Sequence, residues 1–212
     1  MLQEPPVTEP RPKGRRVDGR RLRSERTKVL IIEAYLELLR KNPQTPTATQ
    51  IAEQAGYSVR SVFERFADLN ALNLATADYA IVSGQAEAVA RDVDGDRSTR
   101  IRSHVRTRAF ACEKWLPLWR VLVATQDQLA ALKTRVVVAR FGNIERMKLM
   151  YGPELSTLPA PEREQLLIAL GTLISFESWD QMRNCYSLSL EAAQGVWISA
   201  IGRALPPTPV VA

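Results

Sequence analysis

The chain has 212 residues, of which 45% are hydrophobic and 25% charged, and its formal net charge is +6. This length can bury a substantial core, and the sequence contains no run of about 18 apolar residues that could span a bilayer. Only two cysteines, Cys112 and Cys185, and one histidine, His104, occur. They argue against a disulfide framework and a closed zinc site. We therefore expect no metal, no cofactor, no membrane partner and a reducing, cytoplasmic location.

The net charge is concentrated at the N-terminus. Residues 1–30 hold nine Lys or Arg and four Asp or Glu, a balance of +5. Residues 1–22 are rich in Pro and then in Arg, lack apolar periodicity, and contain no apolar segment of a secretory signal. This composition predicts a disordered basic arm. Its clusters, which include Arg15 and Arg16, suit a narrow DNA minor groove. The alternative is a solvated charge run that only maintains solubility.

Two short helices joined by a tight turn are predicted within residues 47–66. Thr47 and Ser58 can cap them, because a hydroxyl satisfies amides at a helix start. Gly56 stands at the turn, where it tolerates positive φ. This arrangement is typical of a helix-turn-helix unit, whose second helix lies in the DNA major groove. An ordinary helical hairpin is the alternative.

Longer helices flank this unit. The first begins near Ser24, keeps apolar residues at helical spacing, and ends at Asn42-Pro43. The next follows Asp68, a suitable N-cap, and runs toward Arg91. After a break at Asp94–Ser98, helical patterns cover 98–113, 115–124, 127–151, 161–186 and 189–204. No stretch alternates with strand period, so the fold class is all-α.

Residues 47–66 resemble the DNA-binding segment of the TetR family of transcriptional regulators. The resemblance extends to the helix from Arg23 to Lys41 and to Phe66-Ala-Asp-Leu-Asn-Ala-Leu72, which is similar to the family's entry into a long connecting helix. The rest is similar only in its helical layout, including Trp179-Asp180 and a last helix after Leu188-Ser-Leu-Glu.

The resemblance implies four parts of the chain. A three-helix DNA-binding domain would occupy residues 23–67, after the disordered arm of residues 1–22. The long helix would join it to a helical effector-binding and dimerisation domain at 68–205, and residues 206–212 would form a flexible tail.

The resemblance also implies DNA contacts. Thr47 and Ser61 would contact phosphates, and Arg60 would be the best candidate for reading a base, while Arg65 would contact phosphate or pair with a nearby acid. The candidate DNA-binding residues are Arg15, Arg16, Thr47, Thr49, Ser58, Val59, Arg60, Ser61, Phe63, Glu64 and Arg65. The sequence departs from the family where Tyr is common at Phe63 and Lys at Val59 and Leu69.

Candidate ligand-binding residues lie in the second part. Basic residues stand at every second position from Arg100 to Arg108, but only Arg100, His104 and Arg108 share one helix face. That face is either a solvated flank or the cationic lining of a site for an anionic effector. Aromatic residues would line an effector pocket or simply form the core. The candidates are His104, Arg108, Trp115, Trp119, Phe141, Phe176, Glu177 and Trp179.

Small residues recur along the last two predicted helices, at Gly171 and Ser175 on one and at Ala193 and Ala200 on the other. Two such helices can form half of a four-helix interface between subunits, which is where the resemblance places a homodimer; packing within one chain is the alternative. No P-loop, G-x-S-x-G or HExxH motif is present. We therefore do not expect an enzyme.

Together these patterns predict a cytoplasmic, homodimeric regulator that binds a palindromic operator in double-stranded DNA. The expected mode is repression, released by an unknown small-molecule effector. The alternative is a helical small-molecule-binding protein with a weak or vestigial DNA-binding domain. Residues 31–67 favour that alternative modestly, because their four basic and four acidic residues leave the helix-turn-helix without net charge.

Overall fold

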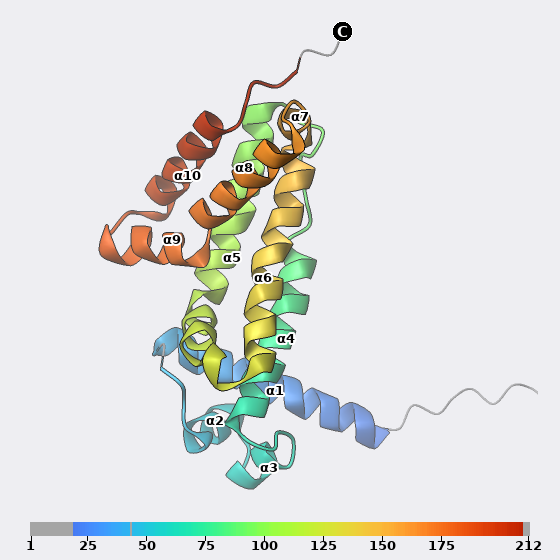
Figure 1. Cartoon of the computed structure of the whole chain (residues 1–212). Coiled ribbons are helices and arrows are strands. Elements are labelled where there is room, and N and C mark those ends of the chain that lie inside the picture. The colour runs from blue at the N-terminus through green and yellow to red at the C-terminus, as the bar shows by residue number, and fades with distance from the viewer. Residues whose placement is uncertain (1–18, 43, 210–212) are drawn as a thin grey trace, which may run out of the picture.

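A computed structural model describes residues 19–42 and 44–209, and every regular element within these residues is helical (Figure 1). The expected all-α class is therefore confirmed. The predicted arm, with Arg15 and Arg16, lies almost wholly outside the described residues, as do residues 210–212. None of the described helices is both long and apolar enough to cross a membrane.

Helices α1 (Gly19–Lys41), α2 (Ala48–Ala55) and α3 (Val59–Phe63) form one end of the molecule. The predicted caps are confirmed: the Thr47 hydroxyl accepts from the Gln50 amide, and the Ser58 hydroxyl accepts from the Ser61 amide. Gly56 follows α2 with a φ of 71°, a left-handed conformation that glycine adopts without strain. These local interactions aim α2 and α3 in different directions, as a helix-turn-helix requires.

The start of α1 differs from the prediction. It begins at Gly19, not near Ser24. No proline separates the two positions, and the Arg-rich sequence between them consists of good helix formers. Part of the predicted basic arm, residues 19–22, is therefore helical.

A bundle of longer helices makes up the remainder (Figure 1). Helix α4 follows its predicted cap, Asp68, which accepts from the Ala71 amide at 2.7 Å. It leaves the N-terminal helices and packs against both long helices of the bundle. The elements are α4 (Leu69–Glu87), α5 (Arg97–Thr125), a short 3-10 turn (Gln126–Gln128), α6 (Ala130–Met150), α7 (Gly152–Leu155), α8 (Ala160–Leu173), α9 (Phe176–Asp180), a π turn (Gln181–Cys185) and α10 (Leu190–Ala204).

Two predicted boundaries in this bundle were wrong. The helix expected to end at residue 113 continues through Pro117, because Trp115, Leu118 and Trp119 are buried along the same helix and hold it in place. The helix expected over 161–186 is instead broken after Leu173. There Ser175 caps α9 by accepting from the Ser178 amide at 3.1 Å.

The face of α5 that carries Arg100 and His104 is not a solvated flank, although Arg102 and Arg106 of the same row are exposed. Arg100 is only 3% exposed and pairs with Glu154 of α7 at 2.6 Å. His104 is also buried, with its Nδ1 2.6 Å from the Tyr151 hydroxyl. The solvated interpretation was wrong for this face because α7 and the end of α6 cover it.

Candidate nucleic-acid interface and ligand pocket

The surface of α2 and α3 presents most of the candidate DNA-binding residues to solvent. Thr47, Thr49, Ser58, Phe63 and Glu64 are exposed, while Val59, Ser61 and Arg65 are half-buried. This surface lies at the end of the molecule opposite the C-terminus (Figure 1). The fold therefore gathers these residues on a surface that no other described helix covers.

The hydroxyl groups on this surface already serve the local fold. Thr47 Oγ1 accepts from the Gln50 amide at 3.3 Å, and the Thr47 backbone N–H donates to Gln50 Oε1 at 2.9 Å, which completes a capping box. Ser58 Oγ and Ser61 Oγ lie 3.0 Å apart. The Thr47 and Ser58 hydroxyls are thus oriented by the helix starts that they cap.

The charges of α3 and of the residues just after it are paired with one another. Arg60 has an 88% exposed side chain, and its Nε donates to Glu64 Oε1 at 3.1 Å. Arg65 Nη1 lies 3.9 Å from the other oxygen of the same carboxylate. Exposed pairs of this kind stabilise a protein by about 0–1 kcal/mol. Because the pair is weak and exposed, another acceptor that approaches this surface, such as a phosphate, can compete with Glu64 for Arg60.

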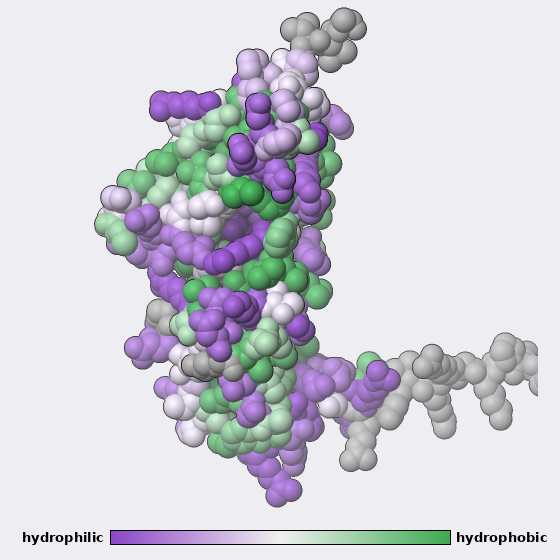
Figure 2. Space-filling view, viewed as in Figure 1, coloured by the Kyte–Doolittle hydropathy of each residue, from purple (hydrophilic) through white to green (hydrophobic). Residues whose placement is uncertain are grey.

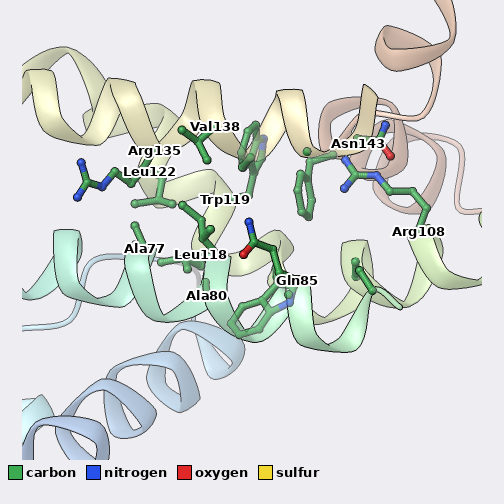
Figure 3. A pocket seen from close by; sticks show the side chains of 18 of the residues that line it. Ala77, Ala80, Gln85, Arg108, Leu118, Trp119, Leu122, Arg135, Val138 and Asn143 are labelled. Carbon is green, nitrogen blue, oxygen red and sulfur yellow. The ribbon is translucent and has the colours of Figure 1, made fainter. Parts of the chain in front are cut away.

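A cavity of about 260 Å³ lies between α4, α5 and α6 (Figure 3). Four of the candidate ligand-binding residues line it: Arg108, Trp115 and Trp119 from α5, and Phe176 from α9. The Trp119 and Phe176 rings stack at a centroid distance of 4.7 Å and an angle of 19°. The α5 residues gather here because positions 108, 115 and 119 fall near one side of the helix.

The other four candidates lie outside the cavity lining. His104 is buried against Tyr151, and Trp179 is buried against Trp197 with a centroid distance of 4.7 Å. Phe141 is 65% exposed. Glu177 is held by Arg140 at 2.8 Å. His104 and Trp179 are therefore buried in the core, which was the alternative expected for these residues.

Sequence reasoning missed the α4 wall of the cavity and part of the α6 wall. Helix α4 contributes mostly small side chains, and α6 contributes Val138 and Arg146 in addition to Asn143. The concentration of Ala and Gly along α4 is the only local signal of this wall. The α4 residues that line the cavity are Ala77, Ala80, Ile81, Gly84, Gln85 and Ala88.

Arg108, Asn143 and Arg146 line the cavity, whereas Arg135, which also lines it, lies at the other end and pairs with Asp78. Figure 3 shows Arg108 and Asn143 at one end, the polar end, with Ala77 and Leu122 toward the opposite end. Burial lowers the pKa of the Arg146 guanidinium. Burial, together with the positive charges of Arg146 and Arg108, lowers the pKa of His104 to about 3. The histidine is therefore neutral, and this end of the cavity carries the charge of its two arginines.

Comparison with known proteins connects this geometry to a family. No protein-family model matches the sequence, and no curated protein matches it significantly. A candidate TetR-family transcriptional regulator from Rhodococcus sp. superposes with a TM-score of 0.63 and 16% identity over 85% of this chain and 99% of its own. A candidate TetR-family regulator from Mesorhizobium loti MAFF303099 gives 0.56 and 13%, over 86% and 96%. A transcriptional regulator from Rhodococcus sp. Rha1 gives 0.60 and 14%, over 88% and 99%.

The chain has the TetR-family fold. In this TetR-like arrangement, α4 is the structural link between the helix-turn-helix and the cavity. Near its start, the buried Tyr35 hydroxyl of α1 donates to Asn73 Oδ1. Farther along, Asp78 pairs with Arg135 of α6 at 2.8 Å. One helix thus contacts the helix-turn-helix end and lines the cavity.

Proposed function

We propose that this protein is a DNA-binding transcriptional regulator that acts as a homodimer on a palindromic operator. The observation that supports it most is the exposed helix-turn-helix surface, which α4 connects directly to a cavity. The fold shared with TetR-family regulators also supports it. Each subunit would place α3 in a major groove, and a two-fold dimer would read two half-sites.

The dimer would form through α8 and α10. These helices lie side by side on one flank of the bundle, and Figure 2 shows hydrophobic surface over that region. Ile168 of α8 is 60% exposed and Val196 of α10 is 45% exposed. Small exposed residues around Val196, such as Ala192 and Gly195, would allow close approach of a second copy. Apolar residues on adjacent helices are typical of four-helix interfaces between subunits.

Regulation would take the form of repression released by a small molecule in the cavity. A ligand shifts an equilibrium only if it binds one state better than the other. Here the ligand would contact α4 at Ala77 and Ala80, one turn beyond the Asn73 contact to α1. Movement of α4 on binding would alter the spacing of the two recognition helices and release the DNA.

The test is a gel shift with the DNA that precedes the gene, together with selection from a random duplex library. We expect a two-fold symmetric site, bound by the dimer. Val196→Asp should abolish binding and yield a monomer in sedimentation with unchanged helix content, because a single neutral recognition helix makes too few phosphate contacts. Lys133→Asp, an exposed change on α6 away from α8 and α10, is the matched control. A monomeric variant that binds with undiminished affinity would refute the dimer requirement.

The basic arm would supply much of the attraction to phosphate, because residues 31–67 have no net charge. Deleting residues 1–18 removes Arg11, Lys13, Arg15 and Arg16 and leaves α1 whole. The log–log dependence of affinity on salt should become shallower by about 0.9 for each phosphate that the arm neutralises in the intact protein. Equal slopes for the two proteins would assign the arm to solubility alone.

A small-molecule-binding protein with a weak DNA-binding domain is the second candidate. The pairing of both Arg60 and Arg65 with Glu64 favours it, since each of these two cations is already matched by an acid of the same segment. Glu64→Gln should separate the two functions. If the variant binds all DNA sequences more tightly, the native α3 contributes little to sequence-specific binding. If it binds the specific site more weakly, Glu64 takes part in sequence recognition.

A further inference from the structure

We propose that the cavity between α4, α5 and α6 binds an organic monocarboxylate with an apolar or aromatic body of roughly ten to fifteen non-hydrogen atoms. The carboxylate lies between Arg108 and Arg146, and the body extends along Trp119 toward Ala77. The regulatory role of this ligand depends on the proposed function. The binding itself is argued only from the residues that line the cavity.

The two arginines at the polar end have no acidic partner. Among the described residues, no carboxylate lies within ion-pairing distance of Arg108 or Arg146. Arg108 Nε donates to the Ile174 carbonyl at 2.9 Å, and its guanidinium lies 4.5 Å from the centre of the Phe176 ring. Arg146 is half-buried, and burial lowers its pKa. The terminal Nη groups of both arginines are thus available to a carboxylate.

Two other arginines near the cavity differ from Arg108 and Arg146 because each has an acidic partner. Arg135, at the other end of the cavity, pairs with Asp78 at 2.8 Å. Arg140, one turn before Asn143 on α6, pairs with Glu177 at 2.8 Å. The protein therefore matches these two cations with its own acids and leaves the two at the polar end without one. An unpaired charge in a partly buried site is unfavourable, and a bound anion removes that penalty.

Neutral polar groups also line the cavity. Asn143 lines the cavity and is buried. Trp115 also lines it and is 6% exposed, and its indole Nε1 has no hydrogen-bond partner among the described residues. A buried N–H without a partner is uncommon in proteins. An oxygen-bearing ligand can satisfy it, whereas a purely apolar ligand leaves it unpaired.

The rest of the cavity requires an apolar body. Leu118, Leu122 and Val138 face Ala77 and Ala80 across it (Figure 3). The flat surface of Trp119, stacked on Phe176, suits a ring or an extended chain. A volume of about 260 Å³ equals that of roughly nine water molecules at about 30 Å³ each. This size suits a small aromatic or medium-chain acid, and a strongly hydrated dianion would leave most of these walls without contact.

A ligand that extends from the two arginines to α4 should allow the cavity to discriminate acids from neutral molecules of the same shape. A neutral analogue of the same shape fills the apolar end but leaves both arginines unpaired. Sites built for a charged or hydrogen-bonding group reject analogues that lack it more strongly than sites that discriminate by shape alone. We therefore expect acids to bind far more tightly than their matched amides.

The experiment measures binding to the purified full-length protein by titration calorimetry, with tryptophan fluorescence as a second readout. The probes are 4-phenylbutyrate, 2-naphthoate and decanoate, each beside its neutral amide, with 3-phenylpropane-1-sulfonate as another monoanion. We expect at least one acid to bind ten-fold or more tightly than its amide. Preference for the sulfonate over all three acids would replace the carboxylate in the proposal, and equal binding of every acid and its amide would overturn it.

Variants locate the anion. Arg146→Met should weaken binding of the preferred acid by at least ten-fold and leave its amide unchanged, and Arg146→Lys should restore part of the loss. Arg108→Met should act in the same direction. Arg106→Met, an exposed arginine on the same helix, is the matched control. Thermal unfolding of each variant reports its folding. Unchanged acid affinity in a folded Arg146→Met protein would overturn the assignment.

These outcomes are separable from those of the regulator proposal because no DNA is present in the binding assay. Acid binding without any specific DNA site would refute the regulator and retain the ligand class. Specific DNA binding without a preference for acids would do the reverse. If both hold, adding the preferred acid to the gel shift should release the DNA.

Discussion

The two ends of this molecule use charge in opposite ways. In the described part of α1–α3, every ion pair joins residues at most four positions apart, as in Lys28–Glu25 and Arg60–Glu64. In the bundle, nearly all pairs join different elements, as Arg100–Glu154 and Arg120–Asp180 do. Local exposed pairs leave their charges accessible to another molecule, whereas long-range pairs fix one helix against another.

Local exposed ion pairs and ion pairs between elements therefore differ in how much they contribute to stability. An exposed pair on one helix contributes a few tenths of a kcal/mol, since solvent and salt screen it. A buried pair is costly to break, because the remaining charge stays in a medium that solvates it poorly. Breaking the buried Arg100–Glu154 pair of the bundle should therefore affect stability, whereas breaking an exposed pair of α1–α3 should leave stability almost unchanged.

The largest effect is expected at the buried pair. Glu154→Leu leaves Arg100 without its carboxylate and should reduce the free energy of unfolding by about 3–5 kcal/mol. The double variant Arg100→Met, Glu154→Leu should recover most of that loss. Urea unfolding followed by circular dichroism measures both. A loss below about 1 kcal/mol for the single variant would remove the distinction between the two ends.

The next largest effect is expected in the pH dependence of the unfolding free energy, to which His104 of the bundle, the only histidine, contributes. Burial lowers its pKa to about 3 in the folded protein, against about 6.5 when unfolded. The unfolded state therefore takes up the proton first, so stability is full above pH 6.5 and falls as pH decreases toward 3. Between pH 7 and 5 we expect a loss of about 2 kcal/mol.

His104→Gln provides the control, because glutamine does not titrate in this range. The difference in unfolding free energy between wild type and variant should decrease from pH 7 to pH 5. If the two proteins lose stability in parallel, another group is responsible for the pH dependence.

At the helix-turn-helix, the proposed function predicts an effect on DNA recognition and none on stability. On the proposed function, Arg60→Ala should cost about 1–3 kcal/mol of specific binding and relax preference at one base pair of each half-site. Arg65→Ala should weaken all sequences alike. Binding-site selection on both variants gives the answer. If Arg60→Ala keeps the parental preference at every position, Arg60 contacts only the backbone and Thr49 or Glu64 carries the specificity.

The smallest effect is expected for an exposed pair on α1. Glu37 interacts with Arg40 at 3.1 Å and Lys41 at 3.7 Å, and all three side chains are exposed. Glu37→Ala should change the unfolding free energy by about 0.5 kcal/mol or less. The same urea experiment measures it beside Glu154→Leu. A loss comparable to that of Glu154→Leu would show that the pairs of the two ends are energetically alike.

The sequence by itself determined the elements of the N-terminal unit. Thr47, Ser58 and Asp68 cap the helices that they were predicted to cap, and Gly56 takes the left-handed conformation at the turn. Each of these features is decided by a hydrogen bond or a backbone preference within a few neighbouring residues. These helix starts could be predicted because each capping residue acts on amides only a few positions away. The all-α class follows from the same local patterns.

Only the tertiary structure decided the interior of the bundle. Helix α5 continues through Pro117, and Arg100 and His104 point into the core, because residues about fifty positions away cover them. Likewise, Arg108 and Trp119 were recognisable as candidates, but Arg146 and the α4 wall of the cavity were not. A cavity is the space that several helices leave between them, so its shape depends on how distant segments pack and not on the pattern of any one helix.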